Sequence, residues 1–256
     1  RDRSVSRGLG DVYKRQSMEN SGFEFSATYR NRDHAFKYDI SANLSTLKNK
    51  VTSLGFGTES YITGAYATYV GQEVGQFYGW VYEGIARTQD QLDNHATQQG
   101  ANVGDCLYKD VSGPDGVPDN VVDEYDRTVI GNRFPNFEYS VSLGASWKGF
   151  DLSLLGQGVS GVDHYASGWG LRPFYQGTPI SQDYIDNMWT EEHTNAKYPR
   201  LYFADMGGTK NQRESTYWLY DGSYFRLKNL TFGYTLPKAL TQKAKIQRLR
   251  VYFSGD

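Results

Sequence analysis

The sequence predicts an all-β protein, specifically part of an antiparallel transmembrane β-barrel with long extracellular loops. Several runs alternate strictly between apolar and polar residues, the period of a strand with two different faces. The 256 residues include 21 Tyr and 28 Gly but only 7 Pro, and the mean hydropathy is −0.64. That composition suits a barrel with a polar lumen and aromatic rims. A secreted, soluble β-sandwich that binds carbohydrate would show the same alternation and stays the alternative.

The first alternating run predicts a β-hairpin near the N-terminus. Apolar residues occupy every second position from Phe23 to Tyr29, and again from Phe36 to Leu44. The polar segment Asn31–His34 between the two runs is a typical turn. In a barrel the apolar set of side chains would contact lipid, and the polar set would line the lumen.

The clearest hairpin in the sequence lies near its middle. Apolar and polar residues alternate from Phe137 to Trp147, and the pattern continues from Phe150 to Leu154. Lys148–Gly149 between them is a two-residue turn. Barrel turns of this length are typical of the periplasmic end.

A third strand is predicted in the segment Asp221–Pro237. Its apolar positions change parity between Leu227 and Leu230, which indicates a β-bulge in one long strand. Pro237 ends the strand because proline cannot donate to a ladder. A basic turn or short helix, Lys238–Arg248, should follow, and then a strand that begins at Leu249.

The segment Val70–Asp93 is rich in glycine and aromatic residues and predicts a pair of strands with bulges. The polar run Thr88–Gln99 predicts a short helix. Thr88 is a candidate N-cap, with Gln91 at the third helical position.

The most acidic stretch, Asp110–Asp126, is a weak candidate for a calcium site. Its oxygen-bearing residues partly follow the alternation of a calcium loop, with Gly116 at the turn. Pro114 breaks the spacing, and an ordinary turn is the preferred interpretation. The candidate ligands are Asp110, Ser112, Asp115, Asp119 and Asp123.

The segment Val162–Tyr217 is long and irregular, as extracellular barrel loops are. Its aromatic side chains could contact a substrate or a partner, although packing within the loop is the preferred interpretation. The residues considered for contact are Trp169, Tyr175, Trp189, Tyr198 and, just beyond the segment, Trp218.

Enzymatic function is not indicated, since the sequence holds no nucleophile elbow, HExxH or P-loop pattern. The letters GQGVSG at 156–161 precede no helix, so no dinucleotide cofactor is expected. The four histidines are widely spaced and are interpreted as solvated or loop residues. Cys106 is expected in a loop without a functional role. With 27 basic and 29 acidic residues and no basic stripe, nucleic acid is not an expected partner.

The first sixteen residues look unlike the rest and resemble translated adapter sequence, so residues 1–16 are expected to be non-native. Residues 17–256 are then predicted to be the barrel part, incomplete at both ends.

Several ordered motifs resemble the SusC/RagA family of TonB-linked outer-membrane proteins. SYFRLKNLTFGYTLP at 223–237 is similar to a family signature near the C-terminus. Further similar segments are MENSGFEFSATYRNRD at 18–33, GQEVGQFYGWVYEGIARTQDQL at 71–92, LYKDVSGPDGVPDNVVDEYDRTVIGN within 107–161, and MWTEEHTNAKYPRL at 188–201. Pro114 is an insertion relative to the family, and Pro118 replaces a usual Ile, which puts a metal role of the loop in doubt.

The resemblance implies the later strands of a barrel of roughly 22 strands with a plugged lumen. It implies TonB-driven import of glycan fragments or peptides through the outer membrane, no enzymatic activity and no required cofactor. The implied partners are a SusD-like lipoprotein, TonB through an upstream region, the transported substrate and outer-membrane lipid. A passive porin without energy coupling is a further alternative.

Overall fold

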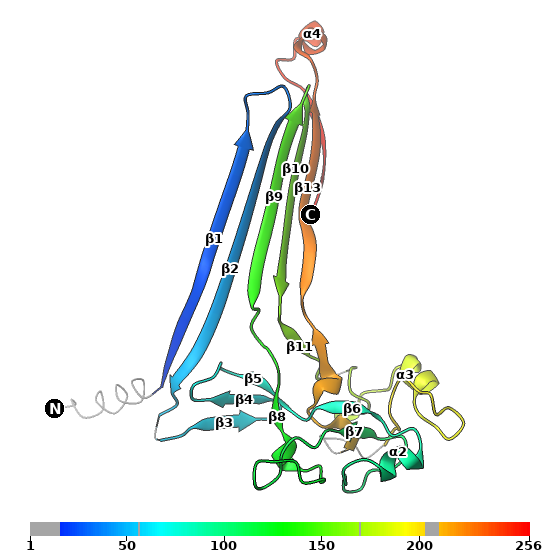
Figure 1. Cartoon of the computed structure of the whole chain (residues 1–256). Coiled ribbons are helices and arrows are strands. Elements are labelled where there is room, and N and C mark those ends of the chain that lie inside the picture. The colour runs from blue at the N-terminus through cyan, green and yellow to red at the C-terminus, as the bar shows by residue number, and fades with distance from the viewer. Residues whose placement is uncertain (1–15, 56, 169, 203–209) are drawn as a thin grey trace, which may run out of the picture. The chain divides into compact units, whose positions relative to one another are not determined.

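The computed structural model describes residues 16–55, 57–168, 170–202 and 210–256 (Figure 1). Residues 1–15 of the predicted non-native lead lie outside this part of the chain. The chain divides into two compact units. The sheet unit comprises Asn20–Lys48, Phe134–Val162 and Asp221–Asp256, and the loop unit comprises Asn49–Arg133 and Asp163–Tyr220 with the residues just before Asn20.

The sheet unit is built on one six-stranded antiparallel sheet with the order β1-β2-β9-β10-β13-β14. Both predicted hairpins and the third strand are confirmed, and Figure 1 shows the long strands running side by side. The strands are β1 (Ser17–Asn31), β2 (Lys37–Ser53), β9 (Phe137–Trp147), β10 (Phe150–Ser160), β13 (Tyr224–Thr235) and β14 (Arg250–Gly255). Within the described residues, β1 and β14 are the two edges of this sheet.

All three short connections of the sheet lie at the same end, because the strands they join are antiparallel neighbours. Residues 32–36 join β1 to β2. Lys148 and Gly149 join β9 to β10 with φ of 45° and 91°, the left-handed pair of a type I′ turn. The helix α4 (Lys238–Thr241) and the 3-10 helix η5 (Gln242–Ala244) lie between β13 and β14. The two long connections, from β2 to β9 and from β10 to β13, leave the opposite end.

The predicted bulge in the third strand is confirmed and lies at Lys228. Leu155 of β10 pairs with Asn229, whereas the next residue, Gly156, pairs with Leu227. Lys228 is therefore the extra residue on β13. Because side chains alternate between faces, this one-residue shift returns Leu227 to the face that carries Leu230. The change of parity in the sequence thus leaves the apolar face continuous.

The loop unit is made of short strands and single helical turns. One sheet has the order β3-β4-β5-β8, and two-stranded sheets pair β6 with β7 and β11 with β12. The strands are β3 (Ser60–Thr63), β4 (Tyr66–Tyr69), β5 (Gln76–Gly79), β6 (Tyr82–Ile85), β7 (Cys106–Tyr108), β8 (Thr128–Gly131), β11 (Asp163–Tyr165) and β12 (Leu219–Asp221). The helices are α2 (Gln89–Asp93) and α3 (Gln182–Asn187), with the 3-10 helices η1 (Glu124–Asp126), η2 (Tyr175–Gly177), η3 (Lys210–Gln212) and η4 (Thr216–Trp218).

Two buried clusters hold the loop unit together. Trp80, Cys106, Tyr108 and Val122 form one cluster, and Ile85, Trp189 and Ala196 form the other. Each cluster joins segments that are distant in sequence. The core of this unit is aromatic and small, which suits a structure made of turns with few long elements.

Three local expectations have different outcomes. The Thr88 cap is confirmed, since its side chain accepts from the Gln91 backbone N–H at the start of α2. The segment Val70–Asp93 does form two strands with bulges, but they pair with other strands, β5 with β4 and β8, and β6 with β7. The expectation that Cys106 lies in a loop is wrong, because Cys106 begins β7 and is fully buried.

Among the described residues, the helices are too short or too polar to cross a membrane.

Candidate functional site

The sheet unit presents one continuous apolar face, defined by the strand registers. In the pairings among β2, β9, β10, β13 and β14, the residues on it are aromatic, aliphatic or glycine, except for Ser160 opposite Phe137. Its members, called the apolar face below, are Phe23, Phe25, Ala27 and Tyr29 on β1; Tyr38, Ile40, Ala42 and Leu44 on β2; Phe137, Tyr139, Val141, Leu143, Ala145 and Trp147 on β9; Phe150, Leu152 and Leu154 on β10; Phe225, Leu227, Leu230, Phe232 and Tyr234 on β13; and Val251 and Phe253 on β14.

Aromatic side chains concentrate at both ends of the apolar face, with aliphatic side chains between them. At the short-turn end the ring of Phe150 lies 4.5 Å from Tyr234 and 5.9 Å from Phe232. At the other end Tyr139 and Phe225 stack at 6.1 Å. The 11 residues of β9 span about 33 Å, which at a tilt of about 40° matches the apolar band of outer-membrane barrels, about 25 Å tall.

Glycines 156 and 158 make room for the aromatic rings on this face. A Cβ at Gly156 would lie 2.5 Å from the Phe225 ring, and one at Gly158 would lie 2.6 Å from the Tyr139 ring. A Cβ at Gly158 would also meet the Tyr224 carbonyl oxygen at 2.3 Å. These two glycines therefore permit the close approach of the neighbouring rings, and they lie within β10, which no helix follows directly.

The opposite face of the sheet is mostly polar, with Leu155 and Val159 as apolar members. It carries Ser, Thr, Asn and charged residues, including Asp39 and Asp151. Arg250 donates from Nε and Nη2 to the two carboxylate oxygens of Asp151, a bidentate pair. A bidentate ion pair beside hydroxyl and amide side chains is what a water-filled or plugged lumen accommodates.

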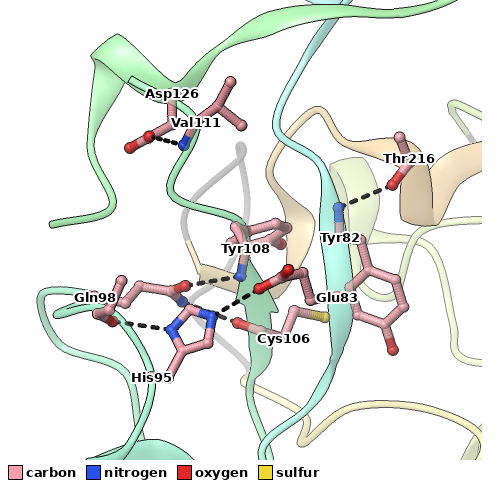
Figure 2. Close-up of polar contacts among 10 residues, drawn as sticks. Tyr82, Glu83, His95, Gln98, Cys106, Tyr108, Val111, Asp126 and Thr216 are labelled. Atoms are coloured by element: carbon pink, nitrogen blue, oxygen red, sulfur yellow. Dashed lines mark hydrogen bonds and ion pairs between the residues drawn. The ribbon is translucent and has the colours of Figure 1, made fainter. Parts of the chain in front are cut away.

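In the loop unit, the acidic stretch is organised by a carboxylate that the sequence analysis did not select, Asp126. Asp126 is fully buried. Its Oδ1 accepts from the backbone N–H groups of Val111 at 2.7 Å and Ser112 at 3.1 Å, and its Oδ2 accepts from that of Asp123 at 2.7 Å. Figure 2 shows Asp126 beside Val111. The Asp-x-x-Asp spacing of a capping box was the sequence signal that could have identified it.

Three of the candidate calcium ligands also accept hydrogen bonds from backbone N–H groups of this loop. Asp110 accepts from Asn120 N–H at 2.6 Å, Asp119 from Val121 N–H at 3.0 Å, and Asp123 from Tyr125 N–H at 2.8 Å. Asp115 lies exposed in the turn at Gly113–Gly116, and Ser112 is partly buried. Across the described residues, no three His, Cys, Asp or Glu side chains are grouped as metal ligands.

Calcium titration tests the candidate metal role of this loop. We expect no heat beyond dilution and no rise in thermal midpoint, because one oxygen each of Asp110, Asp119 and Asp123 already accepts a backbone N–H and the described carboxylates are not grouped around a common point. Isothermal titration calorimetry of the purified receptor that carries this chain is the measurement. A saturable heat that disappears in Asp119→Asn would contradict this expectation and support the calcium site.

The aromatic residues predicted for contact divide into buried and partly exposed positions. Trp189 and Trp218 are only 7% and 5% exposed, and guanidinium groups lie over both rings, Arg200 at 5.8 Å and Arg172 at 5.0 Å. Both indoles therefore pack the loop unit internally. Trp169 lies outside the described residues.

Tyr175 and Tyr198 are partly exposed. Tyr175 begins η2, and its carbonyl oxygen accepts from Thr178. Tyr198 stacks on Tyr184 with centroids 4.4 Å apart, and its hydroxyl donates to Asp183. The hydroxyl of Tyr198 and the ammonium of Lys197 lower the pKa of the Asp183 carboxyl. This corner is a fixed polar and aromatic surface of the loop unit.

Side-chain amides complete the pairing of β7, a feature that sequence reasoning missed. Gln98 donates to the Cys106 carbonyl at 2.9 Å and accepts from Tyr108 N–H at 3.2 Å, so its amide replaces a neighbouring strand (Figure 2). Asn211 accepts from Cys106 N–H at 2.7 Å and donates to buried Asp105 at 3.1 Å. Gln98 lies only 8 to 10 residues from its partners, whereas the Asn211 contacts join segments 105 and 106 residues apart, and no periodic pattern in the sequence indicates either of them.

His95 differs from the expectation of a solvated side chain, although it does lie in a loop. Its side chain is 12% exposed, and its Nε2 lies 3.1 Å from Glu83 Oε2 (Figure 2). Burial raises the pKa of Tyr82 to about 12 and raises the pKa of Tyr108 well above its ordinary value. Such phenols stay protonated near neutral pH and act as structural groups.

Comparison with known proteins finds relatives that align with nearly the whole chain. The chain is 30% identical over 250 residues to TonB-dependent receptor P3 of Formosa agariphila, an alignment that covers 93% of this chain and 24% of that receptor. TonB-dependent receptor P26 of the same organism is 26% identical over 247 residues, again 93% of this chain and 24% of the relative. The resemblance to TonB-dependent receptors is confirmed.

Solved structures agree with the TonB-dependent receptor fold. The RagAB peptide transporter superposes with a TM-score of 0.68 at 24% identity, covering 93% of this chain and 25% of that chain. The RagAB peptide importer in the 'open-open' state gives 0.66 at 24% identity, covering 94% and 26%. No family model matches. The chain thus spans about a quarter of the length of the TonB-dependent receptors and RagAB chains that it matches.

The predicted fold class is confirmed as well: the sheet is antiparallel, open in the described residues, and matches part of the TonB-dependent receptor barrel. The localisation is the outer membrane, that of the TonB-dependent receptors. The relatives are receptors and transporters by name and none is named as an enzyme.

Proposed function

We propose that this chain forms part of the barrel wall and extracellular loops of a TonB-dependent nutrient transporter. The apolar face of the sheet unit carries the proposal, since it is continuous over six strands and bounded by aromatic residues at both ends. Similarity to TonB-dependent receptors over 93% of the chain supports it independently. On this proposal, residues 17–256 belong to the barrel part, and the lead 1–16 is foreign to it.

The secreted β-sandwich fits this sheet less well. Phe23 and Phe25 on β1 are 83% and 65% exposed, and the sheet unit is built on a single six-stranded sheet. A sandwich in water would bury such rings against a second sheet. In a barrel wall the same rings contact lipid, which requires no covering layer.

The orientation of the sheet follows from its connections. Outer-membrane barrels have short periplasmic turns and longer extracellular loops. We infer that the end with the Lys148–Gly149 turn is periplasmic and that the two long connections are extracellular. The loop unit is built from these long connections, so its surface is where a substrate or partner would arrive.

For the transported substrate we propose glycan fragments or peptides, and for the partner a SusD-like lipoprotein that covers the extracellular mouth. A structural neighbour titled a peptide transporter supports the peptide class. Tyr175 and Tyr198 are the contact candidates of the described loop unit, because they are partly exposed. Trp189 and Trp218 would act indirectly by holding the loops in shape. TonB would engage the transporter outside the residues of this chain.

Uptake by cells that carry or lack this receptor tests the proposal. Cells with the receptor should deplete defined glycan or peptide mixtures, measured by mass spectrometry of the medium, and deletion of tonB or a protonophore should abolish depletion. Depletion that persists without TonB would support the passive porin and contradict energy coupling. A receptor found in the culture medium instead of the outer membrane would support the secreted sandwich.

The loop role needs its own experiment in the intact receptor. We expect Tyr175→Ala with Tyr198→Ala to reduce uptake or co-purification of the lipoprotein, since both rings are accessible on the loop unit. Tyr220→Ala is the matched control, an exposed tyrosine of β12 outside the candidate set. Unchanged uptake and unchanged co-purification would remove the two tyrosines from the proposal.

A further inference from the structure

The turn between β13 and β14 combines positive charge with exposed apolar side chains. Lys238, Lys243, Lys245 and Arg248 are all exposed, and the sequence from Pro237 through Leu249 contains no Asp or Glu. The apolar side chains among them are also exposed, Leu240 at 57% and Ile246 at 40%. We call residues 237–249 the basic turn. Exposed leucine and isoleucine beside lysine are poorly suited to water and well suited to a membrane interface.

The basic turn is fixed to the aromatic end of the apolar face by backbone hydrogen bonds. Thr235 N–H donates to the Gly149 carbonyl at 2.7 Å, and Leu236 N–H donates to the Leu249 carbonyl at 2.9 Å. The start of the basic turn therefore lies beside the Lys148–Gly149 turn. Lys148 adds a further cation there, with its ammonium 4.8 Å above the Trp147 ring.

A hollow of about 430 Å³ lies within the sheet unit at the same end. Phe36, Tyr38, Trp147, Phe150 and Phe232 line it together with Leu152, so its wall is largely aromatic and continuous with the lipid-facing surface. An acyl chain is the occupant that matches this wall, since the surrounding face already contacts lipid in the proposed barrel. Lys148, whose ammonium lies over the Trp147 ring of this wall, is the cation that a phosphate at the mouth would meet first.

The charges nearby do not neutralise the basic turn. Arg250 is the partner of Asp151 through its bidentate pair, so that carboxylate is already engaged. On the β1–β2 connection at this end, Arg32 is followed directly by Asp33, and the first residues of β2 include Lys37 and Asp39. The two positive and two negative charges of these four residues cancel. The basic turn and Lys148 therefore keep their net positive charge.

We propose that the hollow and the basic turn together bind an anionic phospholipid of the membrane leaflet at the short-turn end. The acyl chain lies against the aromatic wall, and the phosphate is held by Lys148 and the lysines of the basic turn. This inference rests on the barrel part of the proposed function. It does not depend on the substrate, TonB or the lipoprotein partner.

The test is native mass spectrometry of the intact receptor, purified in detergent and mixed with phosphatidylglycerol or phosphatidylcholine of the same acyl chains. We expect retention of phosphatidylglycerol about tenfold above phosphatidylcholine, because each near-surface lysine favours an anionic lipid several-fold. The triple variant Lys238→Gln, Lys243→Gln, Lys245→Gln should reduce that preference about tenfold. The control Lys48→Gln, Lys50→Gln, Lys109→Gln removes the same charge from exposed lysines elsewhere and should keep it.

Three outcomes would overturn the inference. Equal retention of the two lipids would exclude headgroup recognition, and equal behaviour of both triple variants would exclude the basic turn. Displacement of phosphatidylglycerol by an equal concentration of glycerol phosphate would show an anion site without an acyl-chain component. Each of these outcomes would leave the barrel part of the proposed function unaffected. A receptor that is soluble without detergent would contradict the proposed function itself.

Discussion

Leu143→Arg is expected to destabilise the membrane-inserted receptor by about 2–4 kcal/mol, the cost of a cation at the bilayer midplane on a barrel's outer face. Leu143 lies in the middle of β9, where it pairs with Ile40 and Leu154 on the apolar face. The arginine would have to lie among acyl chains or distort the bilayer to reach water. Urea unfolding of the receptor in phosphatidylcholine vesicles measures the change.

Ser142→Arg is the matched control for that substitution. Ser142 is the preceding residue on the same strand, and it pairs with Ser41 and Leu155 on the opposite face. In a barrel its side chain points to the lumen, so we expect a change of about 1 kcal/mol or less. Equal destabilisation by both arginines would contradict the assignment of the apolar face to lipid. A larger effect at Ser142 would reverse the assignment of the two faces.

Asp126→Ala is expected to cost the loop unit about 3–5 kcal/mol of local stability. The buried carboxylate accepts three backbone N–H groups, from Val111, Ser112 and Asp123. Each buried donor left without a partner costs about 1–3 kcal/mol, and the three do not add fully. Hydrogen-exchange mass spectrometry of the intact receptor should show faster exchange across residues 110–126, with the barrel strands unchanged.

Asp115→Ala is the control for this loop, because Asp115 is exposed in the same acidic stretch. We expect an effect within about 0.5 kcal/mol and unchanged exchange. Asp126→Asn should lie between the two, since an amide keeps one acceptor oxygen but turns donors toward a backbone N–H. If residues 110–126 show the same hydrogen-exchange rates in the Asp126→Ala and Asp115→Ala variants, the carboxylate of Asp126 does not organise the loop.

The strands of the sheet unit could be predicted because their signal is local. Period-two alternation marks β1, β2, β9 and β10, and the parity change at 227–230 identified the bulge at Lys228. In a barrel wall one face of the sheet contacts lipid and the other lines the lumen. The alternation within each strand therefore shows which of its side chains lie on which face. No long-range information is needed to assign its faces.

The loop unit could be predicted only in part, because its stability comes from contacts across the sequence. The cap at Thr88 is local and was found, whereas the partners of β5 and β6 were not. Cys106 belongs to a strand that is completed by the side chains of Gln98 and Asn211. A side-chain amide that substitutes for a strand leaves no periodic signal.

The candidate contact residues show the same division. Aromatic residues in a long loop allowed either packing within the loop, the preferred interpretation, or contact with a partner. The pattern could not separate Trp189, which packs against Ile85, from the partly exposed Tyr198. Burial there depends on residues far away in sequence, such as Gly104, whose missing Cβ leaves room for the Trp189 ring. The side chain of Asp126 was likewise overlooked among the six carboxylates of one acidic stretch.

The order of strands in the sheet has a kinetic consequence. Three hairpins, β1–β2, β9–β10 and β13–β14, each close over a short connection, whereas the pairings β2–β9 and β10–β13 join strands across long ones. Closing a short loop is fast, and non-local strand pairing carries the entropy of ordering the intervening chain. Assembly of this sheet should therefore begin with three independent hairpins, and its rate should be set by the two steps at which they align with one another.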